Sequence, residues 1–110
     1  MSALRPEAAL TRAVEALAGH GFAVVARNTR GDSVYLKPEG CSYALRVSNH
    51  ARTPKQRKNH PDAITSLVIR AATGPAQVDA LVETALRNFA GERRKREGDR
   101  GGESGRPAVP

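Results

Sequence analysis

Residues 33–47 alternate between apolar and polar side chains on both sides of a tight turn, and this pattern constrains the fold most. In SVYLK (33–37), Val34 and Leu36 share one face. In CSYALRV (41–47), one face carries Cys41, Tyr43, Leu45 and Val47, and the other carries Ser42, Ala44 and Arg46. The intervening Pro-Glu-Gly is typical of a tight turn. The pattern predicts two antiparallel strands with one buried face and one face open to water.

Two further strands and two helices complete the predicted domain. Residues 21–27 and 63–70 are short, apolar and rich in β-branched side chains, which favours strands. Residues 6–18 and 75–89 repeat apolar side chains at helical spacing, and each begins with a proline, which the first helical position tolerates. The order α-β-β-β-β-α predicts a two-layer α+β fold. We expect a four-stranded, mostly antiparallel sheet with both helices on one face.

The 110 residues suffice for one domain, which we place at residues 1–91. Gly91 is a natural helix stop. Residues 92–110 are basic, rich in glycine and proline and nearly free of apolar side chains, so they are predicted to form a disordered tail. The charged run ERRKRE at 92–97 leaves open a solvated extension of the last helix.

Cysteine content and hydropathy favour a cytoplasmic location. The single cysteine, Cys41, excludes an intramolecular disulfide framework and fits a reducing compartment. No apolar run approaches the roughly 18–20 residues of a membrane span, so no membrane partner is expected. The sequence gives no indication of oligomeric state.

Positive charge is concentrated in the connection between the third and fourth predicted strands. The chain has a formal net charge of +7, and residues 50–60 contain four cations and no acid. Residues 48–62 show no hydrophobic periodicity, and connections of this length are usually functional or disordered. Focused positive charge indicates an anionic partner. The candidate anion-binding residues are Arg46, His50, Arg52, Lys55, Arg57, Lys58 and His60.

The partner that best fits these residues is nucleic acid, either DNA or RNA. Arginine and lysine donors match phosphate oxygens. The sequence shows no aromatic cluster that would stack single-stranded bases and no helix with a base-reading pattern, so binding without sequence specificity is expected. A solvated loop without a binding role is the alternative.

Catalysis and metal binding are not predicted. His50 and His60 each follow an asparagine, which suggests a His-Asn-His nuclease, but that site needs a hairpin followed by a helix. Here the loop leads into an apolar strand, and no Cys-x-x-Cys or His-x-x-x-His spacing occurs. We therefore predict a non-enzyme with no catalytic residues, metal or cofactor.

Residues 33–50 resemble a pattern of small uncharacterised proteins of bacteria and their phages. The pattern consists of S-x-Y-L, a tight turn and L-R-V-S-[DN]-H, and this chain has Asn49 where aspartate is expected. The resemblance implies no particular chemistry. Two functions remain open: a small basic nucleic-acid-binding or accessory protein that uses residues 46–60, or a protein-interaction module of a phage or mobile element. Such a module would, for example, inhibit a host nucleic-acid-handling or defence enzyme.

Overall fold

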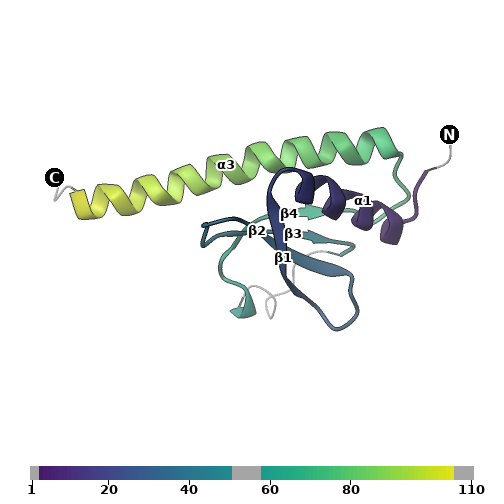
Figure 1. Cartoon of the computed structure of the whole chain (residues 1–110), viewed down its shortest axis with the longest axis horizontal. Helices are drawn as coiled ribbons and strands as arrows, with labels where there is room; N and C mark the ends of the chain where they lie inside the picture. The colour runs from purple at the N-terminus through teal and green to yellow at the C-terminus, as the bar shows by residue number, and fades with distance from the viewer. Residues whose placement is uncertain (1–2, 51–57, 106–110) are drawn as a thin grey trace.

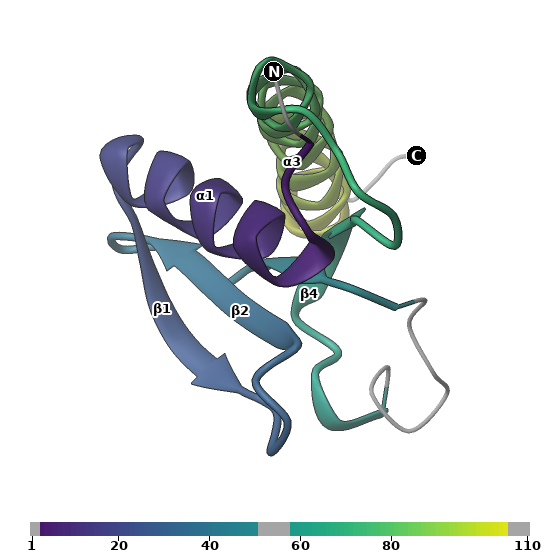
Figure 2. The ribbon, with the colours of Figure 1, turned by 90° about the vertical axis from the view of Figure 1, so that its right-hand side faces the viewer.

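Two helices cover one face of a four-stranded sheet (Figures 1 and 2). The computed structural model describes residues 3–50 and 58–105, with side chains described as far as Gly98. The elements are α1 (Pro6–Gly19), β1 (Phe22–Arg27), β2 (Ser33–Pro38), β3 (Ala44–Ser48), β4 (Ala63–Val68) and α3 (Pro75–Gly105). The predicted α+β fold, with the element order α-β-β-β-β-α, is confirmed.

The sheet is mixed, with strand order β1-β2-β3-β4. β2 pairs antiparallel with both β1 and β3, whereas β3 and β4 run parallel, with Ala44 opposite Ala63 and Ser48 opposite Val68. The chain must therefore return along the five residues of β3 before β4 begins, a distance of about 16 Å at about 3.3 Å per residue. Parallel neighbours always need such a crossover connection. The length of the connection between β3 and β4 thus has a topological cause.

The core lies between the helices and the inner face of the sheet. It contains Ala9, Leu10, Ala13 and Leu17 from α1, Val78, Val82, Ala85 and Phe89 from α3, and Val34, Leu36, Leu45, Val47 and Leu67 from the strands. An ion pair joins the helices, because Arg12 donates hydrogen bonds of 2.9 and 2.8 Å to the two carboxylate oxygens of Asp79. Before α1, the backbone of Leu4 exchanges two hydrogen bonds with Thr73, which fixes the chain near the start of α3.

Helix α3 is longer than the sequence predicted. It continues through Gly91 to Gly105, so it includes residues 92–97, where the sequence left an extension open, and residues 98–105 of the predicted tail. The domain boundary at residue 91 stays a prediction. Gly91 does not adopt the positive φ of a helix-stopping glycine. Pairs four residues apart, Arg93 with Glu97 and Arg96 with Glu92, support the extension. The helix extends well past the sheet (Figure 1), and residues 106–110 lie outside the described residues.

Strand β1 is an edge of the sheet and exposes apolar side chains. Val24 and Val25 are 38% and 54% exposed. The pairing with β2 shifts register between Val24 and Ala26, so Val25 is the extra residue of a β-bulge. The regular hydrogen-bond ladder between β1 and β2 is therefore interrupted near the centre of β1.

Replacing Leu17 by alanine should destabilise the fold. The Leu17 side chain projects from α1 and is fully buried in the core. A leucine-to-alanine change at such a position costs about 2–5 kcal/mol. Urea unfolding followed by circular dichroism measures the change. Leu81→Ala is the control, because Leu81 is only partly buried and should cost less. An unchanged midpoint for Leu17→Ala would contradict this core assignment.

Candidate functional site

The structure separates the predicted site residues into different environments. Among those described, Lys58 is exposed, whereas His50 and His60 are partly buried. Arg52, Lys55 and Arg57 lie outside the described residues. Arg46 is 0% exposed, so the prediction that it lies on a face open to water is wrong.

The end of the crossover connection contacts part of the outer face of the sheet, and Figure 2 shows it on the side away from the helices. The His60 ring stacks on Tyr35, with centroids 3.8 Å apart and planes at 18°. Two residues later, Asp62 pairs with Lys37 at 2.8 Å. Tyr35 also packs with Ala44 and Ala63 in a second, small apolar cluster. His60 and Asp62 therefore contact the sheet itself.

The buried guanidinium of Arg46 lies in a polar network at the end of β3. Its Nη2 donates to Ser48 Oγ and to the backbone oxygen of His50, both at 3.0 Å. Ser48 Oγ in turn accepts from the His50 backbone N–H at 3.1 Å and lies 2.8 Å from Ser33 Oγ. The Ser48 hydroxyl also donates to the Asp32 backbone oxygen at 3.0 Å. We call Asp32, Ser33, Arg46, Ser48 and His50 the polar network; Asp32 and His50 are its partly exposed members.

Asn49 connects this network to the rest of the fold. Its side-chain Nδ2 donates to the backbone oxygens of Pro6 and Ile69, both at 2.9 Å. The asparagine thereby joins the start of α1 to the residue after β4. A carboxylate accepts hydrogen bonds and donates none, so aspartate could not make these two contacts. The departure from the expected aspartate thus has a local structural reason in this chain.

Ser33, His50 and Asp32 approach one another but are not arranged as a catalytic triad. His50 Nε2 faces both Ser33 Oγ, at 3.1 Å, and Asp32 Oδ1, at 3.2 Å. A triad needs the serine and the carboxylate on opposite ring nitrogens. The other nitrogen, Nδ1, faces the Arg46 guanidinium at 3.5 Å, and a guanidinium only donates. With Ser33 and Asp32 on the same ring nitrogen, the imidazole does not relay between them as the histidine of a triad does.

The carboxyl group of Asp32 has a pKa below its ordinary value. The main cause is a hydrogen bond donated by the Asn28 side chain; burial opposes it, and the charges of His50 and Arg30 lower the pKa further. Because folding lowers this pKa, the ionised carboxylate stabilises the fold above the ordinary value of about 3.9. That contribution is lost as the pH falls through the lower, folded value.

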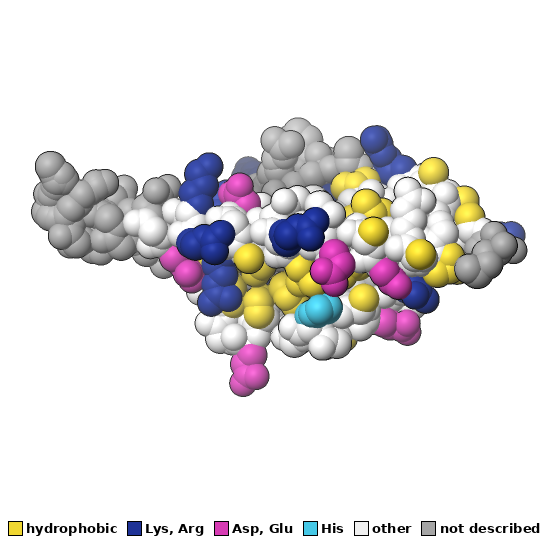
Figure 3. Space-filling model, turned by 90° about the horizontal axis from the view of Figure 1, so that it is seen from above, with side chains coloured by type: hydrophobic (Ala, Val, Ile, Leu, Met, Phe, Trp, Pro, Cys, Tyr) yellow, Lys and Arg dark blue, Asp and Glu magenta, His cyan; other side chains and the backbone are white. Residues whose placement is uncertain are grey.

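A second basic region, absent from the predicted site, lies on the distal half of α3. Arg93 and Arg96 pair with carboxylates, but Arg94 and Lys95 are exposed and form no ion pair among the side chains that the structure describes. Figure 3 shows lysine and arginine side chains gathered over the C-terminal half of this helix, with hydrophobic side chains exposed beside them. In the sequence, the run of four cations RRKR at 93–96 is the feature that indicates this basic region.

The described residues reveal neither a metal site nor a membrane span. Within residues 3–50 and 58–98, no three histidine, cysteine, aspartate or glutamate side chains form a group that could hold a metal ion. In the same part of the chain, no helix is both long and apolar enough to cross a bilayer. Cys41 is free and partly buried against the core.

Asn49→Asp should destabilise the protein although it restores the expected residue of the pattern. The new carboxylate would face two backbone oxygens and leave both without their donor, at a cost of about 1–3 kcal/mol or more. Thermal unfolding near neutral pH measures the loss. Asn59→Asp adds the same charge at an exposed position and should change stability by less than about 0.5 kcal/mol. Equal stability of the two variants would contradict the role of Asn49.

Asn28→Ala should raise the pKa of Asp32, because it removes the hydrogen bond that lowers this pKa most. The side-chain carboxyl signal of Asp32, followed by NMR against pH, measures the shift. The stability that Asp32 contributes above its ordinary pKa, and loses on acidification, should also be smaller in the variant. Asn59→Ala, at an exposed position, is the control. An unchanged Asp32 titration in Asn28→Ala would contradict the assignment.

Comparisons with known proteins add no family to this description. A scan against protein-family models found no match, and searches of curated proteins and of solved structures found none either.

Proposed function

We propose that the protein binds nucleic acid, without sequence preference, through exposed cations on two segments. One segment is the connection between β3 and β4, where Lys58 is exposed and the sequence adds three further cations. The other is the distal half of α3. Arg46, which the sequence analysis included in this site, is removed from it because its side chain is buried.

The observation that supports the proposal most is the exposure of Arg94 and Lys95. Cations that are already paired with carboxylates offer little net charge to a partner, as at Arg93 and Arg96. Arg87, two helical turns before Arg94, adds an exposed guanidinium to the same side of α3. Exposed, unpaired cations attract phosphates and fix the protein on the backbone without reading bases.

Affinity for nucleic acid should fall steeply with salt. Each cation that neutralises a phosphate of duplex DNA contributes about 0.9 to the slope of log K against log salt, so Arg87→Ala/Lys95→Ala should reduce that slope by about 1.8. Arg57→Ala/Lys58→Ala should reduce it similarly if the connection also contacts phosphate. Fluorescence anisotropy with random-sequence duplex DNA and with RNA, over a series of salt concentrations, measures both.

Arg5→Ala/Arg70→Ala is the matched control for this experiment. It removes two exposed cations near the opposite end of α3, where Leu4 and Thr73 are joined, and it lowers the net charge equally. Its salt slope should equal that of the wild type. No binding by the wild type at low salt would overturn the proposal. A slope reduced equally in all three variants would show a general charge effect without a defined site.

A further inference from the structure

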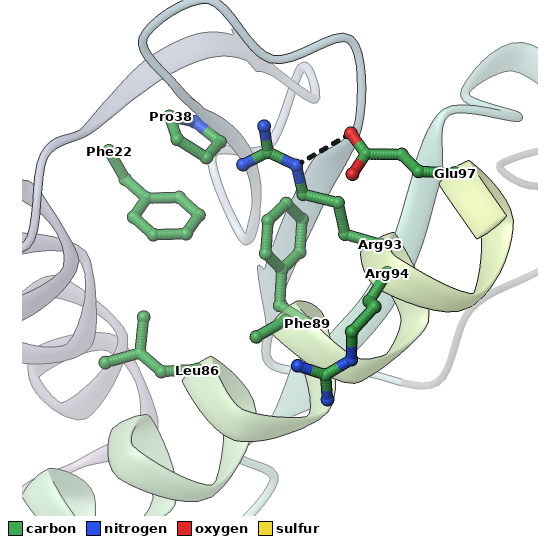
Figure 4. A pocket seen from close by; sticks show the side chains of 8 residues that line it. Phe22, Pro38, Leu86, Phe89, Arg93, Arg94 and Glu97 are labelled. Atoms are coloured by element: carbon green, nitrogen blue, oxygen red, sulfur yellow. Dashed lines mark hydrogen bonds and ion pairs between the residues drawn. The ribbon is translucent and has the colours of Figure 1, made fainter. Parts of the chain in front are cut away.

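A hollow of about 460 Å³ lies between the distal half of α3 and the end of the β1–β2 hairpin. Phe22, Pro38, Leu86 and Phe89 line it together with Ala90, and Arg93, Arg94 and Glu97 follow on the helix (Figure 4). Its size falls within the range of about 300–1,000 Å³ that is usual for sites that bind small molecules or side chains.

The hollow forms because α3 continues past the end of the sheet. Phe22 pairs with Pro38 where the β1–β2 hairpin meets the helix. The Phe22 and Phe89 rings, which both line the hollow, contact edge to face with centroids 5.3 Å apart. Along α3, Leu86, Ala90 and Arg94 recur every four residues and so share one side of the helix. The apolar side of α3 is thus continued by charged residues beyond the core.

The two arginines of the hollow differ in their partners. Arg93 donates from Nε to Glu97 at 3.1 Å, and this contact holds its guanidinium beside the hollow. Arg94 is exposed and has no carboxylate partner among the described side chains. A ligand that fits both features has a large apolar group for the interior and a negative charge for the guanidinium.

We propose that this hollow docks an acidic peptide segment of a partner protein, with one large apolar side chain inserted and a flanking carboxylate on Arg94. Aromatic or aliphatic anchors in such pockets dominate many protein interfaces. This surface goes beyond the proposed nucleic-acid binding, although the two share Arg94.

Two other occupants fit the hollow less well. The interior is lined by apolar side chains, so a nucleobase placed there would bury polar edges without partners, which is costly. A second copy of this chain carries the same net charge of +7, so long-range repulsion opposes its approach to the arginines.

Selection from a library of short random peptides on the full-length protein tests the proposal. Enriched sequences should share one large apolar residue flanked by aspartate or glutamate. The amide signals of Leu86, Ala90 and Arg94 in ¹H–¹⁵N NMR spectra should shift when an enriched peptide is added. Enrichment without this combination, or shifts confined to other elements, would overturn the proposal.

Substitutions at the edge of the hollow give the matched comparison. Ala90 is exposed, so Ala90→Glu should leave the core intact, place bulk at the hollow and offer Arg94 an internal carboxylate four residues away. Affinity for the enriched peptides should fall by roughly tenfold or more, as for loss of an anchor pocket. Ala80→Glu makes the same change at another exposed position of α3, outside the hollow, and should have no effect.

The charge requirement is tested separately. Arg94→Gln should weaken peptide binding severalfold, whereas Arg87→Gln, which removes an exposed arginine outside the hollow, should not. Equal peptide affinities of Ala90→Glu and the wild type would overturn the proposal. It would also fail if single-stranded oligonucleotides shifted the amide signals of Leu86 and Ala90 and still did so in Arg94→Gln, because the hollow itself would then hold a nucleobase.

Discussion

The parallel pairing of β3 with β4 determines which parts of the surface remain available to partners. Two parallel neighbours force the chain to return along the sheet, and the helices already occupy the inner face. The end of the return segment lies on the outer face, where His60 stacks on Tyr35 and Asp62 pairs with Lys37. The part of this face around Tyr35, Ala44 and Ala63 thereby becomes a second, smaller interior.

Arg46 illustrates the consequence of this second interior. A buried guanidinium is tolerated only where acceptors surround it. Ser48 Oγ and the His50 backbone oxygen provide two of them, and Ser33 lies within 2.8 Å of Ser48. The serines, the arginine and the histidine of the 33–50 pattern therefore act together in holding the end of β3 against the turn before β2. This accounts for the spacing of the pattern without invoking catalysis.

Much of the fold was predictable because it depends on local periodicity. Helical spacing identified α1 and the buried side of α3, and alternation placed Leu45 and Val47 on the core side. Predictions failed where the outcome depends on distant residues. The burial of Arg46 follows from strand order, which alternation does not encode. The apolar hollow requires Phe22 and Phe89, 67 positions apart in the sequence, to meet in space. The end of α3 was misplaced because a glycine was interpreted as a stop although charged pairs continue the helix beyond it.

The bulge in β1 has a consequence for how the sheet meets other chains. An edge strand offers unpaired N–H and C=O groups, and the exposed Val24 and Val25 make this edge attractive to further strands. The extra residue at Val25 breaks the even spacing of those groups. Any strand that extended the sheet on this side would have to carry a matching irregularity, which few sequences do by chance. The bulge thus disfavours the pairing of strands from other chains with this edge, while Val24 and Val25 stay in contact with water.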